Sequence, residues 1–310
     1  MGSEMCIRDR SCSVVSLLLP LGMHLRGLGM VLLFGVFFYQ PTKEERVGVT
    51  IMDVGQGLSV VIETPELTWV YDAGAKFSDT FDIGDRVVAP FLREKGIRDI
   101  GLIISHDDQD HAGGAKALAE QFNTFVYWAG EASTSITAND EPCIGGQIWQ
   151  GEQVKLEVLW PLPQEAFQQP YLLSGNDASC VVLLSIFASG QVPQKVFRVL
   201  LTGDISRKVE KRLLPYLPRQ IDLLVSPHHG SRTSSFSEFV EHIKPRYVVH
   251  SAGYKHHYGH PHPKVWARYE QVGSQQWNTA DAGAVSLEVD LPSGEYKILT
   301  ARSDEKKRWY

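Results

Sequence analysis

A run of histidine and aspartate residues that directly follows an apolar segment constrains the fold of this chain most strongly. Residues 101–105 read GLIIS, and they are followed by HDDQDH at positions 106–111 and by AGG at positions 112–114. The apolar run predicts a buried strand, and the small residues allow a helix to begin close to whatever the loop holds. We therefore expect a strand whose carboxyl end presents imidazole and carboxylate groups.

Three other apolar segments end in turns that also carry polar groups. They run into the sequences DAG, TGD and PHHGS, which contain Asp72, Asp204 and the histidine pair His228 and His229. Binding sites are commonly built where strands end, so these turns are expected to converge with the HDDQDH segment.

Strand and helix patterns alternate along residues 46–302. The expected strands cover residues 47–53, 59–64, 68–71, 101–105, 155–160, 180–187, 197–202, 221–226, 246–251, 285–290 and 295–300. The expected helices cover residues 87–94, 112–121, 205–214, 235–242 and 263–272. Such alternation predicts an α/β fold in which sheets pack face to face and helices cover the outside. We expect one domain over residues 46–302 and a polar tail over residues 303–310.

Convergence of the four turns would bring several carboxylates together. Bare carboxylates of Asp108, Asp110 and Asp204 at about 4 Å would repel by several kcal/mol at a protein-like dielectric constant. A divalent cation removes this cost, and the HxDxDH spacing, completed by a distant Asp and His, supplies ligands for two cations. A pair of divalent cations is a common device for phosphoryl transfer, so the pattern predicts a hydrolytic metal site.

Each of these residues also has a simpler interpretation. Any one Asp or His of the turns can be a solvated loop residue, and Asp72 can serve as a structural hydrogen-bond acceptor that orients a ligand. His260, in the sequence GHP, is a candidate general acid or phosphate contact, and a surface histidine is the equal alternative.

The first part of the chain has a different composition. Residues 14–39 are almost wholly apolar, and a charged run follows at positions 43–46. This pattern predicts a membrane segment within residues 1–45, in preference to a signal peptide or a buried helix. Basic residues are more numerous before it than after it, which favours an extracytoplasmic position for the large domain. The first ten residues fit neither part and are interpreted as a sequence-assembly artefact.

The overall charge and the cysteines exclude some classes of protein. A net charge of -6 argues against a broad basic surface that holds nucleic acid by phosphate neutralisation alone. The four cysteines show neither a CxxC pair nor metal-type spacing, so neither a disulfide framework nor a zinc knuckle is expected. Cys143 and Cys180 are expected to be a small buried apolar residue and a loop thiol.

The motifs resemble a known superfamily. The order YDAG, SHDDQDHAGG, LLTGD and PHHGS is similar to the metallo-β-lactamase superfamily, whose general motif is HxHxDH. IMDVGQGLSVVIET, GNDASCVVLL, YGHPHP and GAVSLEV are similar, more narrowly, to the C-terminal domain of the ComEC family of DNA-uptake channels. The resemblance covers residues 47–300. It implies a four-layer αββα sandwich, preceded by the last membrane segment of the channel.

The resemblance also implies roles for single residues. The implied metal ligands are His106, Asp108, Asp110, His111, Asp204 as a bridging ligand, and His229. His228 is implied as a proton-transfer or supporting residue, with the reverse assignment of the two histidines left open. The implied catalytic residues are Asp110, His228 and His260, and the residues expected to support the ligands are Asp72, Asn176, Ser179 and Ser231.

The chain departs from the general superfamily motif at two places. Asp108 stands where the second His belongs, and residues 176–179 stand where a mid-chain His belongs. Both changes add oxygen donors, which favours Mn²⁺ or Mg²⁺ over a tightly held Zn²⁺ pair, although Zn²⁺ stays an alternative.

The resemblance implies a metal-dependent phosphodiesterase, a nuclease that degrades the non-transported DNA strand at the membrane. Single-stranded DNA, the membrane and the competence DNA-uptake machinery are the expected partners. One alternative is a non-catalytic domain, stabilised by metal, that binds DNA or gates the channel. The other is a metallo-hydrolase that acts on a small molecule.

Overall fold

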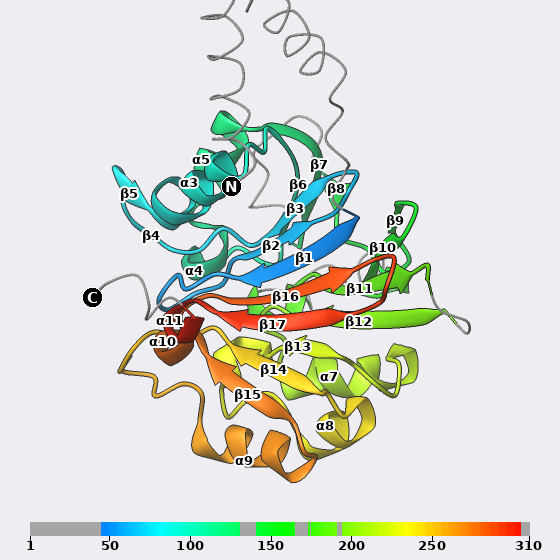
Figure 1. The fold of residues 1–310 in the computed structure, drawn as a ribbon. Coiled ribbons are helices and arrows are strands. Elements are labelled where there is room, and N and C mark those ends of the chain that lie inside the picture. The colour runs from blue at the N-terminus through cyan, green and yellow to red at the C-terminus, as the bar shows by residue number, and fades with distance from the viewer. Residues whose placement is uncertain (1–44, 131–140, 165–172, 174, 191–193, 305–310) are drawn as a thin grey trace, which may run out of the picture. The chain divides into compact units, whose positions relative to one another are not determined.

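The computed structural model describes residues 45–130, 141–164, 173, 175–190 and 194–304 (Figure 1). These residues belong to one compact unit that begins at Glu45. The expected membrane segment falls on residues 1–44, which lie outside the described residues. Within the described part of the chain, no helix combines the length and the apolar character needed to cross a bilayer.

The first large sheet contains eight strands among the described residues. Their order is β17 (Tyr296–Thr300), β16 (Val285–Asp290), β1 (Arg46–Ile51), β2 (Val60–Glu63), β3 (Thr68–Tyr71), β6 (Asp99–Ile104), β7 (Asn123–Ala129) and β8 (Glu141–Pro142). Strands β3, β6, β7 and β8 run parallel, and the other pairs are antiparallel. A separate hairpin is formed by β4 (Lys76–Ser78) and β5 (Phe81–Asp82).

The second large sheet contains seven strands in the described part of the chain. Their order is β15 (Gln275–Asn278), β14 (Tyr247–His250), β13 (Leu223–Val225), β12 (Lys195–Leu201), β11 (Val181–Ala188), β10 (Val154–Trp160) and β9 (Ile148–Gln150). Strands β12 to β15 are parallel, whereas β9 to β12 are antiparallel.

Helices of the described residues connect the strands and cover the sheets. They are α3 (Ala89–Glu94), α4 (Gln109–Ala112), α5 (Ala115–Gln121), α7 (Arg207–Leu213), α8 (Ser237–Ile243), α9 (Pro263–Gln271), α10 (Thr279–Ala282) and α11 (Ala301–Asp304). Short irregular helices are η1 (Gly84–Val88), η4 (Gly175–Ala178), η5 (Leu214–Tyr216) and η6 (Pro227–Gly230). Figure 1 shows α3 and α5 beside the first sheet, and α7, α8 and α9 beside the second.

Three apolar clusters separate the layers. One lies between the two sheets and contains residues of both, among them Val49 and Leu184. A second packs α3 and α5 onto the first sheet, and a third packs α7, α8 and α9 onto the second. Strand β6 contributes Ile103 to the first cluster and Leu102 to the second, so both of its faces are buried. This explains its continuous apolar sequence and confirms the expected α/β sandwich.

The expectation that Cys143 and Cys180 are a buried apolar residue and a loop thiol is wrong. Cys143 and Cys180 form a disulfide across 37 residues, with their Cα atoms 5.7 Å apart. Cys143 donates its backbone N–H to the carbonyl of Ala129 at the end of β7, and Cys180 donates to Ser105 at the end of β6. Because β6 and β7 are neighbours, these two bonds bring the cysteines together, and no spacing rule in the sequence reveals such a tertiary contact.

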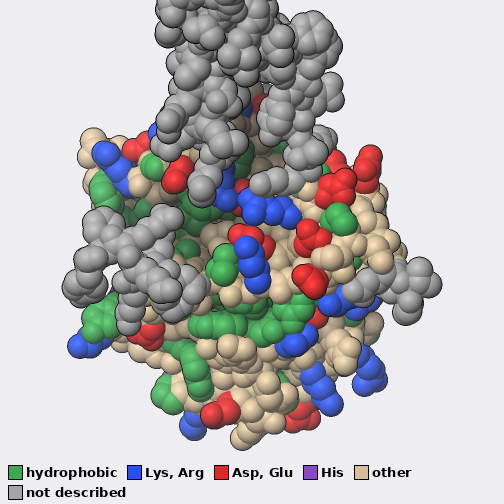
Figure 2. All heavy atoms as spheres, in the orientation of Figure 1, with side chains coloured by type: hydrophobic (Ala, Val, Ile, Leu, Met, Phe, Trp, Pro, Cys, Tyr) green, Lys and Arg blue, Asp and Glu red, His purple; other side chains and the backbone are tan. Residues whose placement is uncertain are grey.

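Charged side chains of both signs are interspersed on the face seen in Figure 2. Lysine and arginine side chains lie among aspartates and glutamates there and form no continuous basic surface.

Candidate metal centre

The candidate site lies where strands of both sheets end. Strands β3 and β6 are parallel and end just before Asp72 and Ser105, and strands β12 and β13 are parallel and end just before Thr202 and Ser226. Carboxyl ends of parallel strands lie at the same edge of a sheet. The four turns singled out in the sequence therefore meet at one place.

His111 is the central side chain of this site and is fully buried. Its Nε2 lies 3.2 Å from a carboxylate oxygen of Asp204 and 3.2 Å from Nε2 of His229. Its Nδ1 lies 2.7 Å from a carboxylate oxygen of Asp72. A hydrogen bond from Nδ1–H to Asp72 fixes the ring and directs Nε2 toward the other two residues.

Two adjoining sets of ligand atoms share His111. One set is formed by His106, His111 and Asp204, and the other by Asp110, His111 and His229, with the ligand atoms of each set within 4.8 Å of one another. Nε2 of His106 is buried and makes no hydrogen bond with the described residues. A carboxylate oxygen of Asp108 lies 3.3 Å from it, but the geometry is not that of a hydrogen bond.

The two adjacent histidines of the PHHGS sequence have different surroundings. Nε2 of His229 lies 3.3 Å from Asp204 and 3.4 Å from Asp110, while its Nδ1 donates to the backbone oxygen of Ser251 at 2.7 Å. His228 is farther out, with Nε2 3.7 Å from Asp204. Of this pair, His229 lies in a ligand set, and His228 stands beside it.

Asp72 and Ser179 hold the ligands in place through hydrogen bonds. The carboxylate of Asp72 accepts hydrogen bonds from the backbone N–H and the hydroxyl of Ser105, at 2.7 and 2.8 Å, in addition to the bond from His111. The hydroxyl of Ser179 accepts a bond from the backbone N–H of Asp204 at 3.0 Å and lies 3.4 Å from Nδ1 of His106.

The remaining expected site residues lie at the rim. The Asp108 side chain is 49% exposed and lies in neither ligand set. The Asn176 amide nitrogen lies 3.4 Å from Nδ1 of His228. Ser231 lines a pocket together with His228 and His229. The His260 ring centre is 6.0 Å from that of His228. The structure therefore brings all the expected residues to one site, with Asp108 as its most solvent-exposed candidate ligand.

The backbone of the site adopts conformations that ordinary residues rarely use. The φ angles of Asp72, His228 and His229 are 59°, 51° and 55°, in the left-handed region. A Cβ atom at Gly57, whose φ is 133°, would lie 2.4 Å from the backbone oxygen of Asp110. Strained backbone of this kind concentrates at functional sites, where the surrounding packing holds it.

The carboxylates and imidazoles shift one another's pKa values. Burial alone would lower the pKa of His229, but Asp204 and Asp110 raise that pKa to about 9. The pKa of buried His111 is likewise raised, by Asp204 and Asp72. Burial would raise the pKa of Asp110, yet the hydrogen bond from His229 and the charge of His111 lower it to about 2. The centre therefore attracts positive charge.

Comparisons with known proteins agree with this geometry. Residues 52–162 match the metallo-β-lactamase superfamily. The chain is 33% identical over 296 residues to a competence protein, ComA, of Neisseria gonorrhoeae, covering 94% of this chain and 39% of that protein. It is 28% identical over 283 residues to recombination protein 2 of Haemophilus influenzae, covering 91% of this chain and 34% of that protein. The chain carries a ComEC-like metallo-β-lactamase domain.

The curated relatives are longer proteins, since the chain spans 34% to 39% of their length. A solved structure of a mutant CmlA β-hydroxylase supports the fold alone. It aligns with a TM-score of 0.50 and 13% sequence identity, covering 85% of this chain and 57% of that protein.

A metallo-β-lactamase fold implies a bound divalent metal ion, and the residues of this ComEC-like domain fit one. Nε2 of His106 is buried and accepts no hydrogen bond from the part of the chain that the structure describes, so it is free to bind a cation. The donor set of imidazoles and carboxylates is one that first-row divalent ions accept.

A pocket of about 230 Å³ opens over the metal centre of the ComEC-like domain. Besides expected residues, Gln56 and Tyr258 line it, and the sequence analysis did not single out either one. Both lie in the DVGQG and YGHPHP motifs that carried the family resemblance. Their position in those motifs is the sequence signal that could have identified them as pocket residues.

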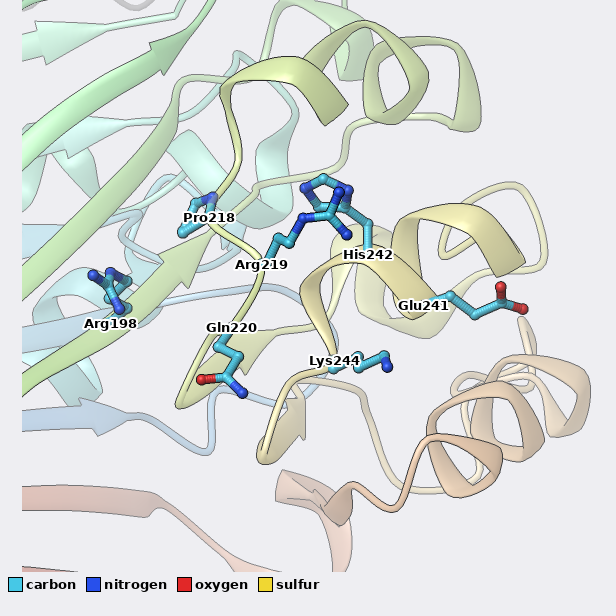
Figure 3. A pocket seen from close by; sticks show the side chains of 7 residues that line it. All are labelled: Arg198, Pro218, Arg219, Gln220, Glu241, His242 and Lys244. Atoms are coloured by element: carbon cyan, nitrogen blue, oxygen red, sulfur yellow. The ribbon is translucent and has the colours of Figure 1, made fainter.

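A second pocket, of about 470 Å³, lies at the other end of the second sheet, before β13 and after α8 (Figure 3). Its lining includes Arg198, Arg219 and Lys244. Figure 3 shows that Lys244 and Glu241 extend away from Arg198, so these charges do not converge on one ligand. The metal centre is therefore the candidate functional site.

Proposed function

We propose that this domain hydrolyses phosphodiester bonds of DNA with the help of one or two divalent metal ions. The observation that carries the proposal is the pair of ligand sets that share the buried His111. Four residues complete the two sets, namely His106, Asp110, Asp204 and His229. Bound there, a divalent cation polarises a phosphate oxygen and lowers the pKa of an attacking water.

The other residues of the site orient the ligands and handle protons. Asp72 holds His111 through Nδ1, and the backbone oxygen of Ser251 holds His229 in the same way. Asp110, which belongs to a ligand set, is assigned to hold the attacking water together with the metal. His228 and His260 line the pocket outside both ligand sets and are assigned to phosphate contact and to proton transfer toward the leaving oxygen.

DNA is the proposed substrate because of the relatives. The similar protein of Neisseria gonorrhoeae is a competence protein, and that of Haemophilus influenzae is a recombination protein. By this likeness, we assign the domain to DNA uptake at the membrane, where it degrades the strand that is not transported. The mixture of nitrogen and oxygen ligands supports Mn²⁺ as the native metal, with Mg²⁺ or Zn²⁺ as alternatives.

The proposed location of the domain is the extracytoplasmic face. The disulfide between Cys143 and Cys180 supports it, because structural disulfides persist in oxidising compartments and are rare in the cytosol. Alkylation of free thiols in intact cells, followed by reduction and labelling, measures the oxidised fraction. A pair that is oxidised in cells agrees with this location, and a fully reduced pair contradicts it.

The hydrolytic proposal is tested with the full chain, stripped of metal and reloaded with Mn²⁺, on a single-stranded oligonucleotide. We expect cleavage by the parent protein, and a fall in kcat/KM of at least about 100-fold for Asp110→Ala. Asp79→Ala is the matched control, since that carboxylate is exposed and its ion pair is with Lys76, outside both ligand sets. Equal activity of the parent and Asp110→Ala would remove the centre from the mechanism.

The exposure of Asp108 favours one second candidate, a metal-stabilised domain that binds DNA or gates the channel without turnover. Because this side chain is 49% exposed and outside both ligand sets, the His106 side of the centre has fewer enclosing ligands. Such a domain binds oligonucleotides and gains thermal stability with Mn²⁺ but releases no nucleotides. The same preparations measured by melting temperature and by nucleotide release separate the two functions.

A further inference from the structure

The segment between β14 and α9 is fastened to the metal centre at both ends. At its start, the hydroxyl of Ser251 donates to the backbone oxygen of Gly57 at 2.7 Å, and its backbone oxygen accepts the bond from His229. At its end, the backbone N–H of His262 donates to the oxygen of Gly230 at 2.9 Å. Both ends of the segment 251–262 are therefore held next to the ligand His229.

Two aromatic rings of this segment are stacked in turn on the ring of His229. The ring of His260 lies over that of His229, with centres 6.3 Å apart and planes 18° apart. The ring of Tyr258 lies over His260 in turn, at 5.6 Å and 25°. His257 also contacts the tyrosine ring, at 4.0 Å and 45°. These contacts restrict the orientation of the Tyr258 ring.

The outermost ring of this stack is open to solvent. The Tyr258 side chain is 60% exposed, yet it lines the same pocket as Asp110 and His229. An exposed aromatic ring beside a phosphate-binding centre is suited to stacking with a nucleobase, because every base has an aromatic face whatever its sequence.

We propose that the ring of Tyr258 stacks on an unpaired base of the nucleotide next to the phosphate held at the metal centre. This inference rests on the proposed function, and it implies that the substrates are single strands and frayed duplex ends. In a duplex, both faces of an interior base are covered by its neighbours, so the ring has no free base to contact. Tyr258 is thus a specificity-determining residue.

Binding is measured first, without turnover. The full chain is titrated, in the presence of Mn²⁺, with an oligothymidylate that carries one 2-aminopurine and phosphorothioate linkages, which slow cleavage. Stacking on the ring quenches the 2-aminopurine fluorescence. We expect quenching with the parent protein and with Tyr258→Phe, and loss of quenching with Tyr258→Ala. Absence of quenching with the parent protein, or its persistence in Tyr258→Ala, overturns the proposal.

Cleavage with Mn²⁺ is measured next on two substrates, the single strand and an oligonucleotide made of abasic residues. We expect Tyr258→Ala to raise KM about tenfold on the single strand and to leave the abasic substrate unaffected. Tyr258→Phe should behave as the parent, because a stack needs no hydroxyl. Tyr216→Ala, which changes a tyrosine that is 57% exposed and lies far from the centre on η5, is the matched control.

Two kinetic results contradict the stacking role. If Tyr258→Ala raises KM equally on both substrates, the residue contacts the phosphate and not a base. If Tyr258→Phe raises KM as much as Tyr258→Ala, the effect comes from the hydroxyl group and not from stacking. If the parent protein cleaves neither substrate, the nuclease proposal fails, and the fluorescence measurement alone decides the stacking role.

Discussion

Asp72 shows how much of the centre depends on a residue that lies in neither ligand set. Its two carboxylate oxygens accept three hydrogen bonds, from the backbone and hydroxyl of Ser105 and from Nδ1 of His111. An asparagine keeps the left-handed backbone but loses one acceptor oxygen. We therefore expect Asp72→Asn to weaken Mn²⁺ binding by about 10- to 100-fold, which calorimetric titration measures.

The exposed Asp79→Asn is the control for this change, because it removes the same charge far from any ligand contact. An Asp72→Asn variant with the Mn²⁺ affinity of the parent protein would show that His111 needs no support from this carboxylate.

Glu210 links the stability of the fold to pH. It is fully buried, and its oxygens accept bonds from the backbone N–H groups of Ser235 and Phe236. Burial raises its pKa from 4.5 to about 7, against the effect of those bonds. Its contribution to stability is therefore complete below pH 4.5, where the unfolded chain is also protonated, and is lost as the pH rises to about 7.

The expected loss is about 3 kcal/mol of the free energy of unfolding. Urea denaturation at several pH values measures it, and Glu210→Gln should remove that part of the pH dependence. The exposed Glu238→Gln should leave the dependence as in the parent protein. If the free energy of unfolding of Glu210→Gln depends on pH as in the parent protein, this carboxyl does not change protonation between pH 4.5 and 7.

At the scale of elements, the disulfide joins the chain next to β8 of the first sheet to the start of β11 in the second. Cys180 also accepts a hydrogen bond from the Tyr71 hydroxyl at 2.7 Å and directly follows Ser179 of the metal centre. Closing a loop of 37 residues is expected to stabilise the fold by about 4 kcal/mol, so reduction should lower the urea midpoint.

The paired variant Cys143→Ser with Cys180→Ser should show the same lower midpoint and no further response to reductant. A parent protein whose midpoint is the same with and without reductant would contradict a stabilising role for this bond.

Some elements could not be predicted because tertiary contacts decide them. The helix expected over residues 112–121 is divided into α4 and α5 at Gly113 and Gly114. A Cβ at Gly114 would lie 2.4 Å from backbone atoms of Ala73 and Gly84, so the glycines serve close packing of three segments as well as a helix start. Strand β15, with the sequence QQWN, was missed because an edge strand needs no apolar run.

At the scale of the whole molecule, the convergence of the ligand-bearing turns could be predicted from the sequence, whereas the positions of the side chains around the pocket could not. His106 to His111 are contiguous and follow a buried strand, so their convergence with Asp204 and His229 follows from topology. The outward position of Asp108 and the exposed ring of Tyr258 depend on side-chain packing between distant segments. Such packing leaves no periodic signal in a single sequence.

The net charge predicts that the proposed DNA binding depends weakly on salt. With a net charge of -6, we expect few phosphates to be neutralised. Each phosphate contact to a single strand contributes about -0.7 to the slope of log affinity against log salt concentration. Arg232 and Lys255 are exposed and close in sequence to the pocket residues Ser231 and Tyr258, and with two such cations we expect a slope no steeper than about -2.

We expect Lys255 to contact one phosphate, so Lys255→Ala should make that slope shallower by about 0.7. Lys116→Ala should not change the slope, since this exposed lysine pairs with Glu120 on α5. Fluorescence titrations of one oligonucleotide at several salt concentrations give all three slopes. A slope of about -5 in the parent protein would require an extended basic surface, and local contacts at the metal centre would then be insufficient to explain binding.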